Sequence, residues 1–246
     1  MTPLEQEIEN NHQAFFADWT AQAQKNWAKL GGKEQFVLSY RRLSCLNAIQ
    51  HTLVLPFFSA KSAAFFLEAQ NDALVSHVNA NVGSWRNALQ SLRSCIENVL
   101  SAIYYTQHPV ELELWSKGAF RIWFQDLHKY LLTHPRLSNI DVATSGLADL
   151  KSEYDVLSKA VHASAANFRM TDGASKVLLW STEDARLGAW STREKKVIEA
   201  ICALVVCFVA PELQGAKNAQ LRAMLSFVTR PGRRTSLKKT LGITIA

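Results

Sequence analysis

The sequence lacks the short motifs on which several common chemistries depend. It contains no G-x-x-x-x-G-K-[ST] phosphate loop, no G-x-G-x-x-G dinucleotide motif, no H-E-x-x-H zinc motif and no G-x-S-x-G serine nucleophile motif. Glycine is also scarce, at 10 of 246 residues, so loops whose backbone wraps a phosphate are hard to build. We therefore expect no cofactor, and any chemistry would use side chains that project from helices.

Cysteine is equally sparse. The four cysteines, Cys45, Cys95, Cys202 and Cys207, form no C-x-x-C pair and have no histidines at matching spacing. This pattern argues against a metal site such as zinc and against a disulfide framework. It predicts buried free thiols in a reducing compartment.

Long hydrophobic runs are absent as well. The longest, Ala200–Ala210, has 11 residues, below the roughly 18 needed to span a bilayer, and predicts a buried helix. The N-terminal MTPLEQEIEN is acidic and amphipathic, unlike a secretory signal, which has a basic segment followed by an apolar one. We therefore expect a cytoplasmic protein that does not contact membranes.

Hydrophobic residues make up 48% of the chain, enough for a sizeable core, and they recur mostly at helical spacing. The clearest stripe advances by four and three residues and is typical of an antiparallel bundle. It consists of Trp85, Leu89, Leu92, Ile96, Val99 and Ile103. The sequence therefore predicts an all-α multi-helix bundle, with at most a small β ribbon near residues 175–190 that includes the extended stretch 176–181.

Capping signals and breakers give the expected helix boundaries. Thr2–Glu5 (TPLE) and Ser191–Glu194 (STRE) both match the capping box and predict two helix starts. The expected helices span residues 3–30, about 38–56, 59–78, 85–106, two or more short helices within 109–134, then 147–168, 191–210 and 216–229. We expect residues 1–215 to form a single helical domain, followed by a basic C-terminal helix and tail over 216–246.

Positive charge is concentrated in that last segment. The net charge is +6, and residues 216–246 hold seven Lys and Arg and no acidic residue, against 20 basic and 21 acidic residues elsewhere. Such a block is often a solvated extension, but it is also suited to nucleic-acid phosphates or an acidic partner. The candidate nucleic-acid contacts are Arg230, Arg233, Arg234, Lys238 and Lys239.

Two helices carry polar residues beside their apolar stripes. On 147–168, Ser158 lies at the stripe's edge, with Asp155 and His162 on the same flank. On 85–106, Arg93 and Glu97 are four residues apart. If the two helices pack together, these residues line one groove.

A simpler alternative explains the same residues by local pairing alone. Arg93 would pair with Glu97, and His162 would be a packed histidine bonded to Asp155 or Ser158. A serine-protease-like triad is not supported, because Asp155, Ser158 and His162 share one helix face.

The phrase Y-x-x-L-S-x-x-V-H, from Tyr154 to His162, follows a helix with R-x-x-x-E at Arg93 and Glu97. This combination resembles HEPN-like helical domains over about residues 84–210, and most closely their uncharacterised bacterial branches. Many HEPN proteins are metal-independent ribonucleases of toxin–antitoxin and antiviral defence systems, and they act as homodimers with the active site at the interface. Their usual R-x-x-x-x-H signature is incomplete here, because Leu157 occupies the arginine position.

The resemblance implies a mechanism in which His162 transfers the proton of a ribose 2′-hydroxyl or of the leaving oxygen. Arg93 or Lys159 would then supply the charge that stabilises the phosphate. Within this candidate site, Tyr154, Leu157 and Val161 are explained by packing alone.

Three functions remain open at this level. The first is ribonuclease activity, and the second is a module that has lost catalysis and binds nucleic acid or a partner protein of the same system. The third is a structural subunit that assembles through the stripe Trp85–Ile103 and the apolar segment Leu241–Ala246.

Overall fold

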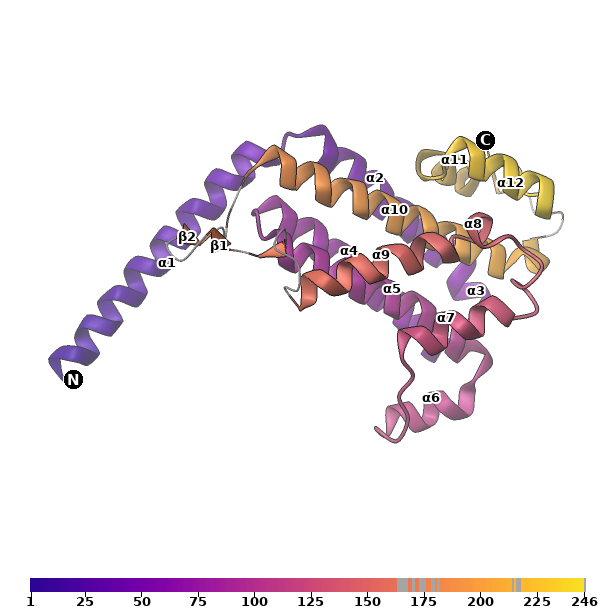
Figure 1. Cartoon of the computed structure of the whole chain (residues 1–246), viewed down its shortest axis with the longest axis horizontal. Coiled ribbons are helices and arrows are strands. Elements are labelled where there is room, and N and C mark those ends of the chain that lie inside the picture. The colour runs from indigo at the N-terminus through magenta and orange to yellow at the C-terminus, as the bar shows by residue number, and fades with distance from the viewer. Residues whose placement is uncertain are drawn as a thin grey trace.

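The computed structural model describes residues 1–162, 168–169, 171–172, 176–177, 180, 182–213, 215 and 218–245. They fold into an α-helical bundle with one short β ribbon, which confirms the predicted fold class (Figure 1). The elements are α1 (Pro3–Leu30), α2 (Glu34–Ile49), the π-helical turn η1 (Gln50–Val54), α3 (Leu55–Phe57), α4 (Ala60–Asn81), α5 (Trp85–Gln107), α6 (Pro109–Ser116), α7 (Phe124–Thr133), α8 (Val142–Ser145), α9 (Leu147–Val161), β1 (Thr171–Asp172), β2 (Lys176–Val177), α10 (Asp184–Phe208), the 3-10 turn η3 (Ala210–Leu213), α11 (Ala219–Val228) and α12 (Pro231–Leu241).

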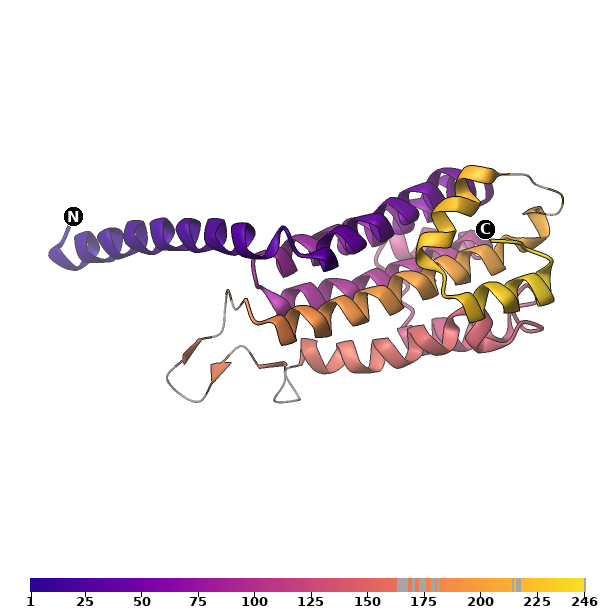
Figure 2. The same ribbon diagram turned by 90° about the horizontal axis from the view of Figure 1, so that it is seen from above.

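The core lies where α2, α4, α5, α9 and α10 pack along one another, as Figure 2 shows. Every member of the stripe from Trp85 to Ile103 is buried, as its spacing predicts. The second half of α10, from Val197 to Phe208, is buried on all sides, which confirms the buried helix predicted from its apolar run. The stripe is thus used inside the chain and leaves no exposed seam for assembly.

One glycine sets how closely two of these helices approach. Gly146 joins α8 to α9 with φ 86°, and a Cβ at this position would lie 2.5 Å from the carbonyl oxygen of Ala200 in α10. Only glycine fits both the backbone angle and this contact. The start of α9 is therefore held directly against the central helix.

The capping box at Thr2 forms as predicted. The Thr2 amide donates to Glu5 Oε2 at 2.5 Å, and the Glu5 amide donates to Thr2 Oγ1 at 3.3 Å. From this start α1 runs as one long helix that projects from the bundle (Figures 1 and 2). Residues 1–19 are all exposed, and α1 becomes buried only at Ala23, Asn26 and Leu30.

The second predicted capping box is wrong. The helix α10 begins at Asp184, so Ser191 lies inside it and caps nothing. Glu194 is buried and paired with Arg42 of α2, with their closest nitrogen and oxygen 2.5 Å apart. A long-range ion pair, rather than a cap, explains the glutamate at this position.

Three further boundaries differ from the sequence-based expectation. The α9 helix ends at Val161, not at residue 168, and residues 163–167 lie outside the described part of the chain. The β ribbon pairs 171–172 with 176–177, and residues 184–190 are helical rather than extended. Residues 178, 179 and 181 of the predicted extended stretch are not described. Between α6 and α7, Phe120 and Trp123 lie in a non-helical connection.

The basic C-terminal segment contains more structure than predicted. The expected helix over 216–229 corresponds to α11, and residues 231–241, expected as tail, form α12. The α11 helix packs on α2, and α12 packs near α8. The segment is thus folded onto the bundle.

All four cysteines are buried with free thiols, as their spacing predicts. Among the described residues, no helix has the length and hydropathy that crossing a membrane requires.

Candidate site between α5 and α9

The structure brings four polar side chains together between α5 and α9. Arg93 Nε donates to Ser158 Oγ at 3.2 Å, and Arg93 Nη1 donates to Glu97 Oε2 at 3.2 Å. The Tyr154 hydroxyl accepts from Arg93 Nη2 at 2.5 Å and donates to Glu97 Oε1 at 2.8 Å. The predicted groove residues Arg93, Glu97 and Ser158 therefore do meet, and Tyr154 joins them.

Tyr154 has a larger role than packing, contrary to the sequence-based interpretation. Its ring stacks on Phe124 of α7, with centroids 3.5 Å apart, and the Arg93 guanidinium lies over the ring at 4.7 Å. Burial, together with the hydrogen bond to Glu97, raises the pKa of Tyr154 to about 12. The hydroxyl therefore stays protonated and bridges Arg93 and Glu97. Its position four residues before Ser158, on the same helix face, was the sequence feature that could have placed Tyr154 in the site.

Arg86, which sequence reasoning missed, holds the C-terminal end of α9. Its Nε donates to the Ala160 carbonyl and its Nη2 to the Val161 carbonyl, both at 3.0 Å. A cation at this end satisfies the last carbonyls and complements the helix dipole. Because Arg86 meets the end of α9 and Glu97 meets its middle, α5 and α9 run antiparallel.

His162 lies just past this anchored end. Its amide donates to the Ser158 carbonyl at 3.2 Å, and its side chain is exposed. Asp155 instead pairs with Lys151 at 2.5 Å, and Ser158 bonds to Arg93 and to the Tyr154 carbonyl. Neither partner expected for the imidazole is therefore bonded to it in the described part of the chain.

The cations proposed to assist His162 differ in position. Lys159 is exposed on α9, whereas Arg93 is half-buried and already bonded to three side chains. Because Arg93 is tied to Glu97, its charge is largely balanced within the cluster. Of the two proposed cations, only Lys159, three residues before His162, therefore presents an exposed charge there.

The acidic side of the cluster extends to α4. Asn98 donates to Asp72 Oδ2 at 2.8 Å. Burial raises the pKa of Asp72 to about 6, and the nearby carboxylates of Glu68 and Glu97 add to this effect. A phosphate at this face would meet these carboxylates as well as Arg93.

The basic C-terminal candidates fall into two groups. Arg233 is 3% exposed and bonds to the Asp149 carboxylate and the Ala143 carbonyl, with Glu199 at 3.3 Å. Arg230 binds the same two carboxylates, and Arg234 donates to the carbonyls of Thr229 and Ser226. These three arginines therefore anchor α12.

Arg230, Lys238 and Lys239 are the exposed members of the predicted nucleic-acid set, and of these Arg230 is paired with Asp149 and Glu199. Arg222 on α11 is exposed as well. Among the described residues of this segment, contact with phosphates or with an acidic partner would thus depend mainly on Arg222, Lys238 and Lys239, because Arg230 is already paired with carboxylates.

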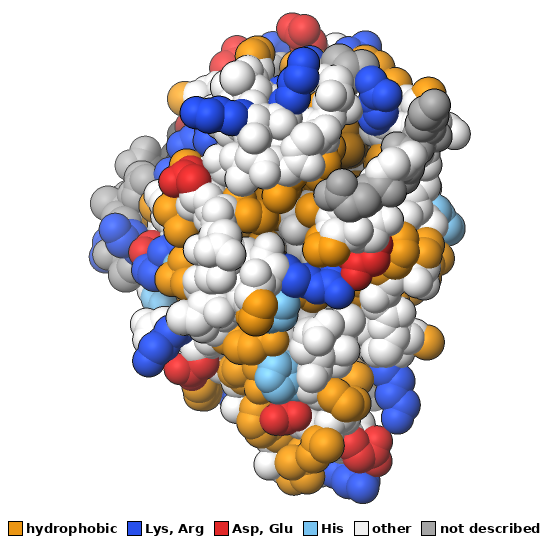
Figure 3. Space-filling view, turned by 90° about the vertical axis from the view of Figure 1, so that its right-hand side faces the viewer, with side chains coloured by type: hydrophobic (Ala, Val, Ile, Leu, Met, Phe, Trp, Pro, Cys, Tyr) orange, Lys and Arg blue, Asp and Glu red, His pale blue; other side chains and the backbone are white. Residues whose placement is uncertain are grey.

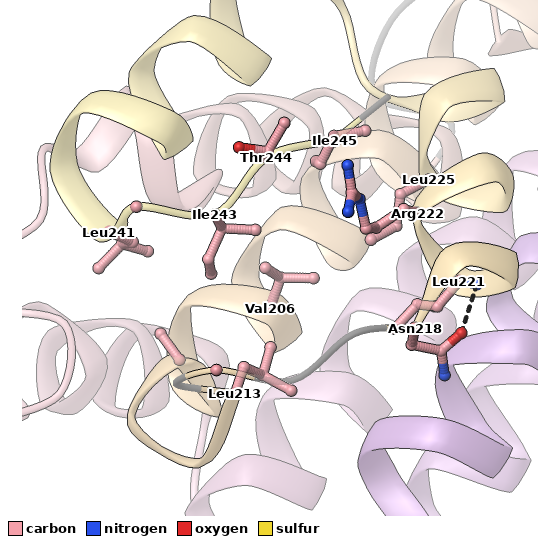
Figure 4. Close-up of a pocket in the computed structure, with 13 residues that line it drawn as sticks. Val206, Leu213, Asn218, Leu221, Arg222, Leu225, Leu241, Ile243, Thr244 and Ile245 are labelled. Carbon is pink, nitrogen blue, oxygen red and sulfur yellow. Dashed lines mark hydrogen bonds between the residues drawn. The ribbon is translucent and has the colours of Figure 1, made fainter.

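A pocket of about 340 Å³ lies beside them, between the end of α10, α11 and the segment after α12 (Figure 4). Its walls are mostly aliphatic and include Val206, Leu213, Leu221, Leu225 and Ile243, with Arg222 among the lining residues. The apolar segment that follows α12, predicted to serve assembly, lines this pocket within its own chain.

In the described part of the chain, no three His, Cys, Asp or Glu side chains are grouped as metal ligands would be. The chain matches no known protein family, no curated protein and no solved structure.

Proposed function

We propose that this chain is a protein-binding module, resembling HEPN-like domains in its α5 and α9 motifs, whose binding element is the projecting start of α1. Residues 1–19, called the arm from here on, are all exposed. They nevertheless carry Leu4, Ile8, Phe15, Phe16 and Trp19. This exposure of large apolar side chains on a projecting helix is the observation that carries the proposal.

The arm's apolar residues share a helix face. At about 100° per residue, Leu4, Ile8, Phe15 and Trp19 lie within roughly 60° of one another. Leu30, buried at the base of α1, lies on the same stripe, so the arm exposes the face that α1 uses to pack. Helices recognised in grooves present such a face.

The energetics favour a covered arm. Leaving a large apolar side chain in water rather than burying it forgoes about 1.5–3 kcal/mol. Helices in proteins also gain most of their stability from tertiary packing of an apolar face, and the arm leaves that face exposed. A partner that covers the stripe would stabilise both the side chains and the helix.

The contacts of the α5/α9 cluster fit a structural role better than catalysis. The guanidinium of Arg93 is bonded to Ser158, Tyr154 and Glu97, which suits a clamp between two helices. His162 has no carboxylate partner among the described residues to orient it. These contacts give the cluster a structural role without requiring turnover.

Site-specific photo-crosslinking in cells that express the full chain tests the proposal. A photoreactive amino acid replaces Phe15 on the apolar face or, as a matched control, Ala21, which is exposed on another face of α1. We expect a discrete adduct from position 15 and none from position 21. Equal labelling from both positions, or no adduct from position 15 in folded protein, would refute the proposal.

RNA cleavage at His162 is the second candidate. The observation in its favour is that Arg93 reaches Ser158, one helical turn before the exposed His162. The expected result is RNA cleavage in the presence of EDTA that His162→Ala abolishes and His51→Ala, also at an exposed histidine, preserves. Purified chain that does not cleave RNA, or a His162→Ala variant with full activity, would exclude this candidate.

A further inference from the structure

We infer that copies of this chain associate head to tail, with the arm of one copy docked on the C-terminal face of the next. The C-terminal face comprises the pocket at α11 and the exposed side chains Arg222, Phe227, Lys238 and Lys239. The inference rests on the proposed role of the arm, and it identifies the partner as a second copy.

The two surfaces carry opposite charge. The arm holds Glu5, Glu7, Glu9 and Asp18, and the first Lys or Arg of the chain is Lys25. Residues 216–246 contain no acidic residue. Because Arg230 and Arg233 are paired with Asp149 and Glu199, the exposed charge of this face comes from Arg222, Lys238 and Lys239. Such charge complementarity steers association and disfavours wrong partners.

The same charges argue against pairing of two arms. Side by side, two arms would bring four carboxylates from each copy together with no Lys or Arg to balance them. Like charges at close range oppose association, most strongly at low salt. The face with the complementary charge is at the C-terminal end of another copy.

The arm and the C-terminal face both also carry exposed apolar groups. The pocket offers aliphatic walls, and Phe227 is 63% exposed. Figure 3 looks onto this end of the molecule and shows Lys and Arg side chains gathered over its upper part, with hydrophobic side chains between them. A pocket of this size accepts a large side chain such as Phe15 or Trp19, and a helix that presents them fits the helix-in-groove mode.

The placement of the two surfaces makes the contact one between copies. The arm projects from one end of the molecule, and α11 and α12 lie at the other (Figures 1 and 2). An arm therefore does not meet its own C-terminal face. A head-to-tail contact repeats from copy to copy, so it produces a closed ring or an open chain rather than a symmetric dimer.

Sedimentation velocity with two end-blocking variants tests the inference. The arm variant combines Glu7→Lys, Glu9→Lys and Asp18→Lys, which spares the capping residue Glu5. The face variant combines Arg222→Glu, Lys238→Glu and Lys239→Glu. All six positions are exposed, so circular dichroism and melting curves should match those of the wild type. Glu68→Lys, an exposed charge reversal on α4, is the matched control.

We expect the wild type and the Glu68→Lys control to form species that grow with concentration and shrink with added salt. Each end-blocking variant alone should associate at least tenfold more weakly. An equimolar mixture should stop at a 1:1 dimer, because the face variant keeps an intact arm and the arm variant keeps an intact face. A chain that carries both sets of changes should associate with itself again.

Two outcomes overturn the inference while the arm keeps its proposed role as a binding element. In the first, the wild type remains monomeric at all concentrations, and position 15 of the arm nevertheless crosslinks to a different protein in cells. The other is loss of association in the arm variant alone, with the face variant unchanged. If neither variant weakens association, the inference fails; the proposed function fails as well only if position 15 also gives no crosslink.

Discussion

The Tyr154 hydroxyl accepts a hydrogen bond from Arg93 and donates one to Glu97, so a single oxygen fastens α9 to both charged residues of the α5 motif. Ser158 adds a fourth member, one helical turn further along α9. Arg93, Glu97, Tyr154 and Ser158 are therefore parts of one helix–helix clamp.

Replacing Tyr154 with Phe should destabilise the fold by about 1–2 kcal/mol, because two hydrogen bonds are lost while Arg93 and Glu97 keep each other. The stacking on Phe124 is retained. Urea unfolding measures the change, and Tyr40→Phe at an exposed tyrosine is the control. Equal stability of both variants would mean that the hydroxyl contributes nothing to the clamp.

The buried ion pair of Arg42 and Glu194 should contribute more to the free energy of unfolding than the Tyr154 hydroxyl does. Glu194→Ala leaves the Arg42 guanidinium buried without its carboxylate, and we expect a loss of about 3–5 kcal/mol in the free energy of unfolding. Adding Arg42→Met should recover a large part of this loss, as a double-mutant cycle by urea unfolding would show. Additive losses in the double variant would contradict a direct pairing.

Glu194 also shows where sequence reasoning stops. Local pattern was sufficient at Thr2, whose capping box forms, and along the stripe from Trp85 to Ile103, which is buried. At Ser191 the same local pattern failed, because Glu194 is satisfied by Arg42, which is 152 residues away in the chain. An ion pair at that separation depends on the packing of α2 against α10, so it cannot be recognised from the spacing of the residues around Glu194.

Arg233 should behave as a structural residue. Arg233→Ala removes the closest cation of Asp149 and Glu199 and leaves Arg230 to pair with both, so we expect a loss of about 1.5–3 kcal/mol in unfolding free energy. Lys239→Ala, at an exposed position of the same helix, should leave stability unchanged. Thermal and urea unfolding compare the two. An Arg233→Ala variant as stable as the wild type would contradict the anchoring of α12 described above.

The candidate site was only partly predictable for the same reason. Spacing on two helices identified Arg93, Glu97 and Ser158, since residues flanking packed stripes meet across the interface. The role of Arg86 could not be predicted, because its guanidinium donates to backbone carbonyls of α9, which have no sequence signature. The sequence shows only the number of basic C-terminal residues, whereas burial and pairing with carboxylates decide which of them remain available.

Stability should depend on pH through Asp72. Its pKa is about 6 in the folded chain and 3.8 as an ordinary value, so ionisation costs the folded state stability as pH rises through this interval. Asp72→Asn removes that cost while keeping an oxygen that can accept from Asn98. The variant should gain in melting temperature relative to the wild type between pH 4 and pH 7, and a pH-independent difference would contradict the raised pKa.

The exposed arm is the central claim, and hydrogen exchange measured at several protein concentrations tests it most directly. Amides of residues 4–19 should exchange rapidly in dilute solution, because this part of α1 leaves its apolar face exposed and helices gain most of their stability from packing such a face. They should become protected as concentration rises. Peptides from α5 should stay protected throughout, and Trp19→Glu should abolish the concentration dependence of the arm. Rapid exchange of residues 4–19 at every concentration, with the partner found by crosslinking also present, would contradict the claim that the arm is a binding element.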